Sequence, residues 1–221
     1  MGRVPSEGSF SVSTVIGIDQ SLTSTGLAML STDGSFARTK AVVPKTHGIP
    51  RLREIEAAVV RWVEDAPEYP DLVVMEGYSF GARGRSIFQL GELGGVLKVA
   101  LARLGFEEST RMPARGLNAR DEEGQGVDGG LVVVPPTQLK KFATSKGTAD
   151  KRQMALSVYK RWGFEADTDD EVDAYALARL GAALLGVADG LTEVQRGVVD
   201  KLLGNGEPES KKTRRKAGLF I

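Results

Sequence analysis

The chain has 221 residues, of which 41% are hydrophobic and 26% charged, and its formal net charge is zero; this composition is typical of one globular domain with a substantial core. It has no cysteine and a single histidine, His47, which excludes disulfides, thiolate metal sites and histidine metal clusters, so a catalytic metal must rest on oxygen ligands, as Mg²⁺ and Mn²⁺ do. No apolar run approaches the roughly 20 residues of a membrane span and no apolar signal segment follows the start, so we expect no membrane contact and a cytoplasmic location, in a bacterial cell or in the host of a phage.

The first part of the chain predicts three strands joined by short connections. Residues 1–12 are polar and rich in Gly and Ser, which favours a flexible arm. Residues 15–19 form an apolar run that ends at a carboxylate, and further strands are expected at 25–30 and 36–43. The Asp-Gly pair at 33–34 supplies the positive φ angles that a hairpin turn demands.

Helices and strands alternate through the remainder of the chain. Apolar spacing predicts helices at 51–65 and 86–104, and apolar runs predict strands at 72–76 and 131–134. Further helices are expected at 137–143, 149–162, 169–187 and 192–203. This order predicts a mixed α/β fold whose sheet has five strands, the first three antiparallel and the last two parallel.

Two segments do not fit the periodic pattern. Residues from about 107 to 130 are rich in Gly, Arg, Asp and Glu, so we expect a mobile insertion there. We place the main domain at 13–190, and we expect residues 191–221 to form a C-terminal helix and a disordered basic tail. That tail carries the basic run from Lys211 to Lys216.

Acidic residues end two of the expected buried strands, Asp19 on the first and Glu76 on the fourth. A buried strand that ends in a carboxylate is a usual way for an α/β sheet to build a site. Either acid alone is also explained as a turn or cap residue.

The helix expected from residue 169 carries the other acids. Thr168 and Glu171 have the spacing of a capping box, which starts the helix near Asp169. Asp170 and Asp173 are three residues apart and share the face that continues into apolar residues. Two acids on an inward face repel each other unless a cation compensates. Four carboxylates without Cys or His suit a two-metal phosphodiesterase, and Asp169 stays open as a substitute ligand.

Basic residues gather away from these acids. Between residues 138 and 161 the chain has seven Lys or Arg residues and one acid, Asp150. An acidic site beside a basic stripe is what a metal-dependent nuclease needs, because the phosphate track must be positive where the metals are not.

Five motifs in collinear order, between about residues 14 and 187, resemble the RuvC-type Holliday-junction resolvases of the RNase H-like superfamily. They are the segments Gly17-Ile18-Asp19-Gln20-Ser21-Leu22-Thr23-Ser24-Thr25-Gly26, Val74-Met75-Glu76, Phe88 to Gly95, Pro136 to Lys151, and Asp170-Glu171-Val172-Asp173-Ala174-Tyr175-Ala176-Leu177-Ala178. The resemblance implies an RNase H-like fold, a homodimer, four-way or otherwise branched DNA as the partner, and two Mg²⁺ ions, with Mn²⁺ as a substitute.

The same resemblance assigns roles to residues. Carried over by position, the catalytic acids and metal ligands are Asp19, Glu76, Asp170 and Asp173, and Lys151 joins the catalytic group. Lys140 and Lys151 fall where the family keeps phosphate-contacting lysines. We expect DNA contacts also from Lys141 and Lys146, and from the loop after Glu76, where rings can stack on bases and arginines can hold phosphates: Tyr78, Phe80, Arg83 and Arg85. One of the two rings is expected to pack beneath the loop instead.

The chain also departs from the family. Gln20-Ser21 stands where the family has Pro-Gly after the first acid. The matching segment in the helix at 86–104 carries Gly91, Gly94 and Gly95, which weaken the helix by roughly 1 kcal/mol each relative to Ala. They indicate a close approach by another backbone, by DNA or by the chain's own sheet.

Other functions remain open at this point. A related nuclease that acts on flaps or other branched DNA fits the same residues. An actin-like ATPase shares the first loop, but it needs two such domains and a second phosphate motif, which we do not find. A non-catalytic binding module of this fold would have lost some of the acids.

Overall fold

The computed structural model describes residues 12–78, 85–108 and 130–204. Its centre is a six-stranded sheet in the order β3-β2-β1-β4-β6-β5. The strands are β1 (Thr14–Asp19), β2 (Thr25–Ser31), β3 (Ala37–Val42), β4 (Leu72–Glu76), β5 (Glu107–Glu108) and β6 (Gly130–Val134). The expectations for the arm, for most of the insertion and for the basic tail lie outside the described residues.

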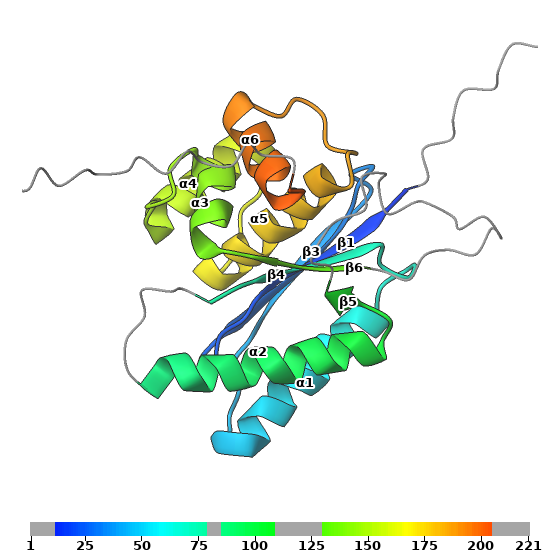
Figure 1. The fold of residues 1–221 in the computed structure, drawn as a ribbon, viewed down its shortest axis with the longest axis vertical. Helices are drawn as coiled ribbons and strands as arrows, with labels where there is room; N and C mark the ends of the chain where they lie inside the picture. Colours follow the sequence, from blue (N-terminus) through cyan, green and yellow to red (C-terminus); the bar gives the residue numbers. More distant parts are fainter. Residues whose placement is uncertain (1–11, 79–84, 109–129, 205–221) are drawn as a thin grey trace, which may run out of the picture.

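The described residues form six helices, which lie on the two sides of the sheet: α1 (Gly48–Glu64), α2 (Arg85–Arg103), α3 (Pro136–Thr144), α4 (Lys151–Trp162), α5 (Asp169–Leu184) and α6 (Glu193–Leu202). Figure 1 shows α1 and α2 on one face of the sheet and α3 to α6 on the other. Among the described helices, none is long and apolar enough to cross a bilayer.

The sheet topology confirms the predicted mixed α/β class. β1 pairs with β2, and β2 with β3, in antiparallel fashion, whereas β1–β4 and β4–β6 are parallel. The count of five strands was one too low, because β5 pairs with β6 at the sheet edge. β5 has only two residues, which are too few to show any periodicity in the sequence. It lies at the start of the expected insertion, and β6 begins where that insertion was expected to end.

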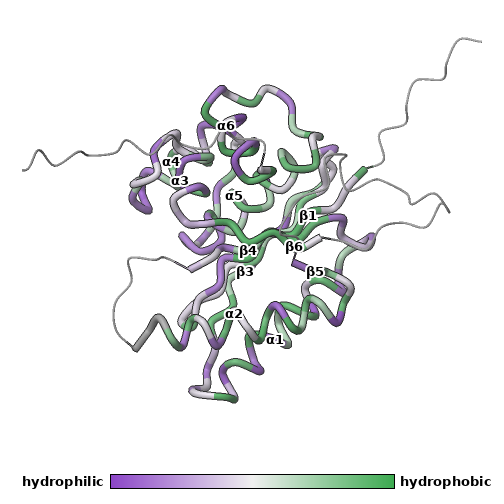
Figure 2. The backbone as a smooth tube through the Cα atoms, in the orientation of Figure 1, coloured by the Kyte–Doolittle hydropathy of each residue, from purple (hydrophilic) through white to green (hydrophobic). Residues whose placement is uncertain are grey.

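Alternation along the strands divides the core into two layers. In β1, Val15 packs toward α5 and its neighbours, whereas Ile16 and Ile18 pack toward α1 and α2. In β4, Leu72 and Val74 likewise share the α5 side. Both faces of the central strands are therefore apolar, as their continuous hydrophobic colouring in Figure 2 shows. This explains why the central strands appear in the sequence as unbroken apolar runs.

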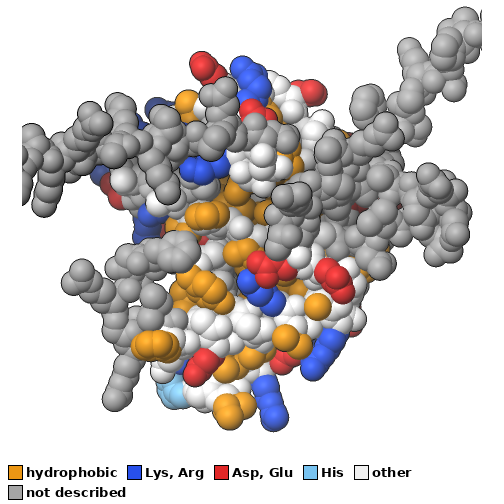
Figure 3. Space-filling view, viewed as in Figure 1, with side chains coloured by type: hydrophobic (Ala, Val, Ile, Leu, Met, Phe, Trp, Pro, Cys, Tyr) orange, Lys and Arg blue, Asp and Glu red, His pale blue; other side chains and the backbone are white. Residues whose placement is uncertain are grey.

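One face of α2 is left uncovered in the single chain. Phe88 is 75% exposed and Val99 52% exposed, and a Cβ added at Gly91 or Gly95 would meet nothing within 4 Å. The spacing of these four residues places them on one side of the helix. Figure 3 shows exposed hydrophobic side chains along the stretch where α2 runs in Figure 1.

Helix α5 crosses the sheet at two glycines. A Cβ on Gly17 would lie 2.0 Å from the main-chain oxygen of Ala174, and a Cβ on Gly26 would lie 1.9 Å from that of Asp170. No side chain fits at either position, so the backbone of α5 rests directly on β1 and β2. The first turn of α5 is thereby fixed against the end of β1.

Replacing Gly26 by Ala should therefore destabilise the protein strongly. We expect a loss of about 3 kcal/mol in the free energy of unfolding, because the backbone of α5 must move away from the sheet. Gly197→Ala is the matched control: this glycine lies in α6 with open space around it, so alanine should stabilise the helix by up to about 1 kcal/mol. Urea denaturation of both variants measures the difference, and equal stabilities would contradict the crossing.

Candidate active site at the carboxyl ends of β1 and β4

The ends of β1 and β4 bring Asp19 and Glu76 together. The two strands are parallel neighbours, with Ile18 opposite Met75, so the acids that follow them lie side by side. Because side chains alternate along a strand, Asp19 points to the same face as Val15, and Glu76 to the same face as Val74. That is the face covered by α5.

The first two turns of α5 bring the other acids to this place. Thr168 accepts a hydrogen bond from the amide of Glu171 at 3.3 Å, and its hydroxyl donates to Glu171 Oε2 at 2.9 Å. The helix therefore begins at Asp169, as the capping pattern predicted. The backbone of Asp170 lies over Gly26, which pairs with Asp19 across β1 and β2. Asp170 and Asp173 are half-buried at this crossing.

Burial dominates the electrostatics of these acids, and repulsion between them adds to its effect. Burial raises the pKa of Asp19 well above its ordinary value, and the charge of Glu76, a hydrogen bond with Glu76 and the charges of Asp173 and Asp170 raise it further. Burial, followed by the charge of Glu76, raises the pKa of Asp173 to about 7. The four carboxyl groups thus act on one another, and all four cannot comfortably be ionised without a compensating cation.

Two of the predicted lysines lie near these acids. Burial raises the pKa of both Glu76 and Asp173, and the charge of Lys140, in α3, partly offsets that rise. Lys151, at the start of α4, forms an ion pair with Asp169 at 3.3 Å, and this contact raises the lysine's pKa. Lys141 and Lys146 are exposed farther along.

The pairing with Lys151 bears on the choice between Asp169 and Asp170. The carboxylate of Asp169 is 49% exposed and faces the lysine. Asp170, rather than Asp169, is among the charges that raise the pKa of Asp19. This geometry favours Asp170 as the member of the acidic group.

Sequence reasoning missed the residues that order the loop between β1 and β2. The hydroxyl of Thr25 donates to the carbonyl of Ser21 at 2.6 Å and accepts from the Ser21 amide at 3.2 Å, which closes the turn. Gln20 donates through Nε2 to the main-chain oxygen of Glu76 at 2.7 Å and so links the two acidic strand ends. The only signal for Gln20 was its departure from the family pattern.

The loop after Glu76 is described in part. Tyr78 is half-buried, and its hydroxyl donates to the carbonyl of Gly91 at 3.4 Å, so its hydroxyl end lies against α2. Phe80 and Arg83 lie outside the described residues, and for Arg85 the structure describes the backbone alone, as the first residue of α2. Of the three helix glycines, Gly94 is the one approached by the chain itself, through Tyr78 and Gln20.

The donor set suits a hard divalent cation. It offers carboxylate oxygens from four side chains, the ligands that Mg²⁺ and Mn²⁺ prefer, and its shared negative charge favours a cation. Within the described ranges, no three acidic or histidine side chains stand in a ready-made metal-holding arrangement. Ligation therefore requires the carboxylates to turn toward a common ion.

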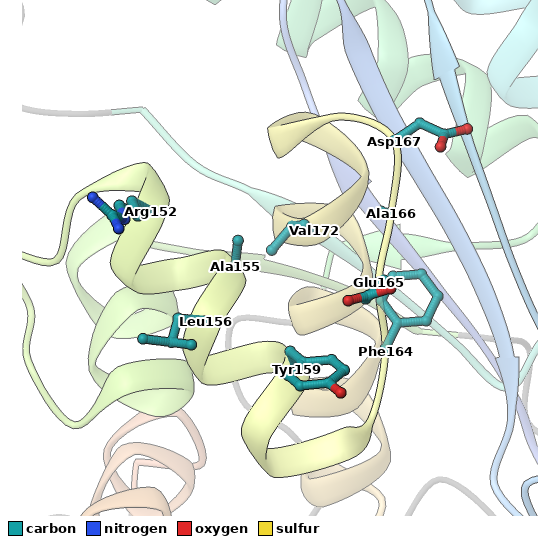
Figure 4. A pocket seen from close by; sticks show the side chains of 9 residues that line it. All are labelled: Arg152, Ala155, Leu156, Tyr159, Phe164, Glu165, Ala166, Asp167 and Val172. Carbon is teal, nitrogen blue, oxygen red and sulfur yellow. The ribbon is translucent and has the colours of Figure 1, made fainter.

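A separate groove lies away from the four acids. A hollow of about 550 Å³ runs between α4 and the segment before α5, and Figure 4 shows its lining. The residues are Arg152, Ala155, Leu156, Tyr159, Phe164, Glu165, Ala166, Asp167 and Val172. None of the four acids lines it, so we do not assign the phosphodiester chemistry there.

Comparisons with known proteins agree with the motifs. No family model matches the chain. Crossover junction endodeoxyribonucleases RuvC from Mycobacterium ulcerans and Mycobacterium marinum are each 26% identical over 175 residues, which cover 74% of this chain and 80% of theirs. These matches confirm the resemblance to RuvC-type proteins.

Solved structures show the same architecture. The structure of Thermus thermophilus RuvC is 22% identical, with a TM-score of 0.56 over 79% of this chain and 98% of its own. The T. thermophilus RuvC complex with a Holliday junction substrate is 21% identical, with a TM-score of 0.55 over 80% and 98% of the two chains. The RNase H-like fold predicted from the sequence is thereby confirmed.

Proposed function

We propose that the chain is a metal-dependent endodeoxyribonuclease of the RuvC type, which resolves four-way DNA junctions by paired nicks. The observation that carries this proposal is the meeting of Asp19, Glu76, Asp170 and Asp173 at one end of the sheet, with their coupled charges. The similarity to RuvC endonucleases along 80% of their length supports the choice of substrate. The proposed place of action is the cytoplasm of a bacterium, or of a phage host.

In this function the four acids hold the divalent ions, two Mg²⁺ in our proposal, with Mn²⁺ as a substitute. Bound ions supply an activated water and neutralise charge at the leaving oxygen. The protein's own part is to hold the four carboxyl groups close together, so that a bound cation favours their ionised forms. Lys140, within electrostatic reach of Glu76 and Asp173, limits that repulsion and offers a positive charge to a DNA phosphate.

Lys151 is proposed to contact a DNA phosphate. In the free chain it is paired with Asp169 at the surface, where an ion pair contributes little stability. A DNA phosphate can therefore compete for the lysine at small cost. Lys141 and Lys146 are exposed and lie between Lys140 and Lys151 in the sequence, and we propose that they also contact DNA phosphates.

We further propose a homodimer formed through the uncovered face of α2. A two-fold substrate is matched by a two-fold enzyme, and the open glycines Gly91 and Gly95 allow a second backbone to approach between Phe88 and Val99. Within the described part of the chain, nothing lies within 4 Å of a Cβ built on Gly91 or Gly95, so no contact there accounts for these glycines.

Phe88→Asp should therefore convert a dimer into a monomer, with a dimer dissociation constant raised at least about tenfold, because a charge would be buried at the interface. Ile49→Asp is the control, since Ile49 is 67% exposed on α1 and its replacement should leave the mass unchanged. Light scattering at micromolar concentration measures both. A wild-type monomer, with junction present as well, would refute the dimer.

Mapping the cuts tests the proposed function. With Mg²⁺ and a four-way junction of defined sequence, we expect two nicks at symmetry-related positions in strands of the same polarity, and none in EDTA. A single nick, or cutting confined to flaps, would contradict junction resolution and favour a related nuclease that acts on other branched DNA.

A further inference from the structure

Because side chains alternate along a strand, the side chain of Gln20 lies on the far side of the sheet from that of Asp19. The Gln20 side chain is 5% exposed, and it reaches from the end of β1 to the end of β4. Nε2 donates to the main-chain oxygen of Glu76 at 2.7 Å. The orientation of the amide follows from chemistry, since a carbonyl oxygen can only accept.

This orientation leaves Gln20 Oε1 buried and without a hydrogen-bond partner in the described part of the chain. A buried polar atom without a partner is costly, and in native proteins such an atom calls for an explanation. The unpaired Oε1 atom of Gln20 lies near a side-chain hydroxyl group.

The hydroxyl belongs to Tyr78. A Cβ on Gly94 would lie 2.1 Å from Tyr78 Oη and 2.8 Å from Gln20 Oε1, so both atoms converge on the same bare stretch of α2. The hydrogen bond that Tyr78 makes here, to the carbonyl of Gly91, is 3.4 Å long, near the limit of such bonds. Tyr78 Oη and Gln20 Oε1 therefore lie near each other, and only glycine at position 94 leaves room for both.

We infer that Gln20 is a positioning residue: through its amide it fixes the main chain of Glu76, and through Oε1 it accepts a hydrogen bond from Tyr78, which ties the acidic pair to α2. The inference rests on the proposed function and deepens it. Gln20 touches neither DNA nor ion in this role. It acts through Glu76, as outer hydrogen-bond partners do for the ligands of many metal sites.

Ion binding measured without DNA tests the inference, by calorimetric titration of Mn²⁺ into the full-length protein. Gln20→Met keeps the volume and removes both hydrogen bonds, so it should weaken Mn²⁺ binding by about tenfold. Tyr78→Phe removes one hydroxyl and should weaken binding by about threefold. Tyr159→Phe removes a hydroxyl that is exposed on α4 and should change nothing.

The double variant supplies the decisive comparison. If Tyr78 acts through Gln20, Tyr78→Phe should have no further effect on Mn²⁺ affinity in the Gln20→Met background. Independent, multiplying effects, or wild-type affinity in Gln20→Met, would overturn the inference. Wild-type protein that binds no divalent ion would instead refute the proposed function. If Gln20→Met does not fold, wild-type Mn²⁺ affinity in Tyr78→Phe alone overturns the inference.

Discussion

Protein carrying Asp19→Asn should fold, bind a four-way DNA junction and leave it uncut. Asn has the shape of Asp without the charge, so the substitution removes a proposed ligand from the centre of the acidic group. If the bound metal loses several kcal/mol of its stabilisation of the transition state, the rate of DNA cleavage falls on the order of a thousandfold or more. Junction binding should persist or tighten, since one repulsive charge near the phosphates is gone.

Gel-shift titration and cleavage assays on one junction separate the two effects. Asp33→Asn is the matched control: Asp33 lies in the exposed turn after β2, where it accepts hydrogen bonds from Ser31 and from the amide of Ser35, far along the strand from Asp19. It should lower stability slightly and leave the cleavage rate per bound enzyme unchanged. Cleavage by Asp19→Asn near the wild-type rate in excess Mg²⁺ would remove Asp19 from the site.

The second large effect concerns stability against pH in the absence of divalent ions. Burial, with the charge of Glu76, holds the pKa of Asp173 at about 7 in the folded protein, against about 4 in an unfolded chain. Between these values the folded state binds more protons than the unfolded state. The stability from this group is therefore fully present below about pH 4 and is lost as pH rises through about 7.

Asp173→Asn removes this dependence. At pH 8 without metal, the variant should be more stable than the wild type by up to roughly 4 kcal/mol, less where solvent and the neighbouring lysines screen the charge. At pH 4 the difference should be small, because Asp173 is then protonated in the folded state and about half protonated in the unfolded chain. Urea denaturation at the two pH values measures the difference in the free energy of unfolding. At pH 8, Mg²⁺ should raise the stability of the wild type but not that of the variant. A difference that does not change with pH would show that Asp173 is not held at raised pKa.

The sequence was sufficient for the elements whose pattern is local. The acids at the ends of β1 and β4 follow apolar runs that only a buried strand explains, and Thr168 with Glu171 marks the start of α5. Because strand ends and a helix start have local signals, three of the supporting elements and their four acids could be proposed together. Their meeting at one place needed the family resemblance or the structure.

Contacts between distant segments had no such signal. The bond from Gln20 to Glu76 spans 56 positions, and nothing in either sequence neighbourhood announces it. Gly17 and Gly26 could be explained as ordinary strand glycines until the backbone of α5 was seen against them. The pairing of Asp169 with Lys151 likewise depends on how α4 and α5 pack, and it favours Asp170 over Asp169 as the member of the acidic group.

Cleavage of a matched panel of DNA substrates tests the central claim most directly. Four-way junctions, three-way junctions, flaps, nicked duplexes and intact duplexes of the same sequence should be incubated with the full-length protein and Mg²⁺, with EDTA as the blank. We expect fast cutting of the four-way junction, slower cutting of the other branched substrates and no cutting of intact duplex. All cutting should depend on Mg²⁺. Equal cutting of every substrate, or cutting in EDTA, would contradict the proposed function.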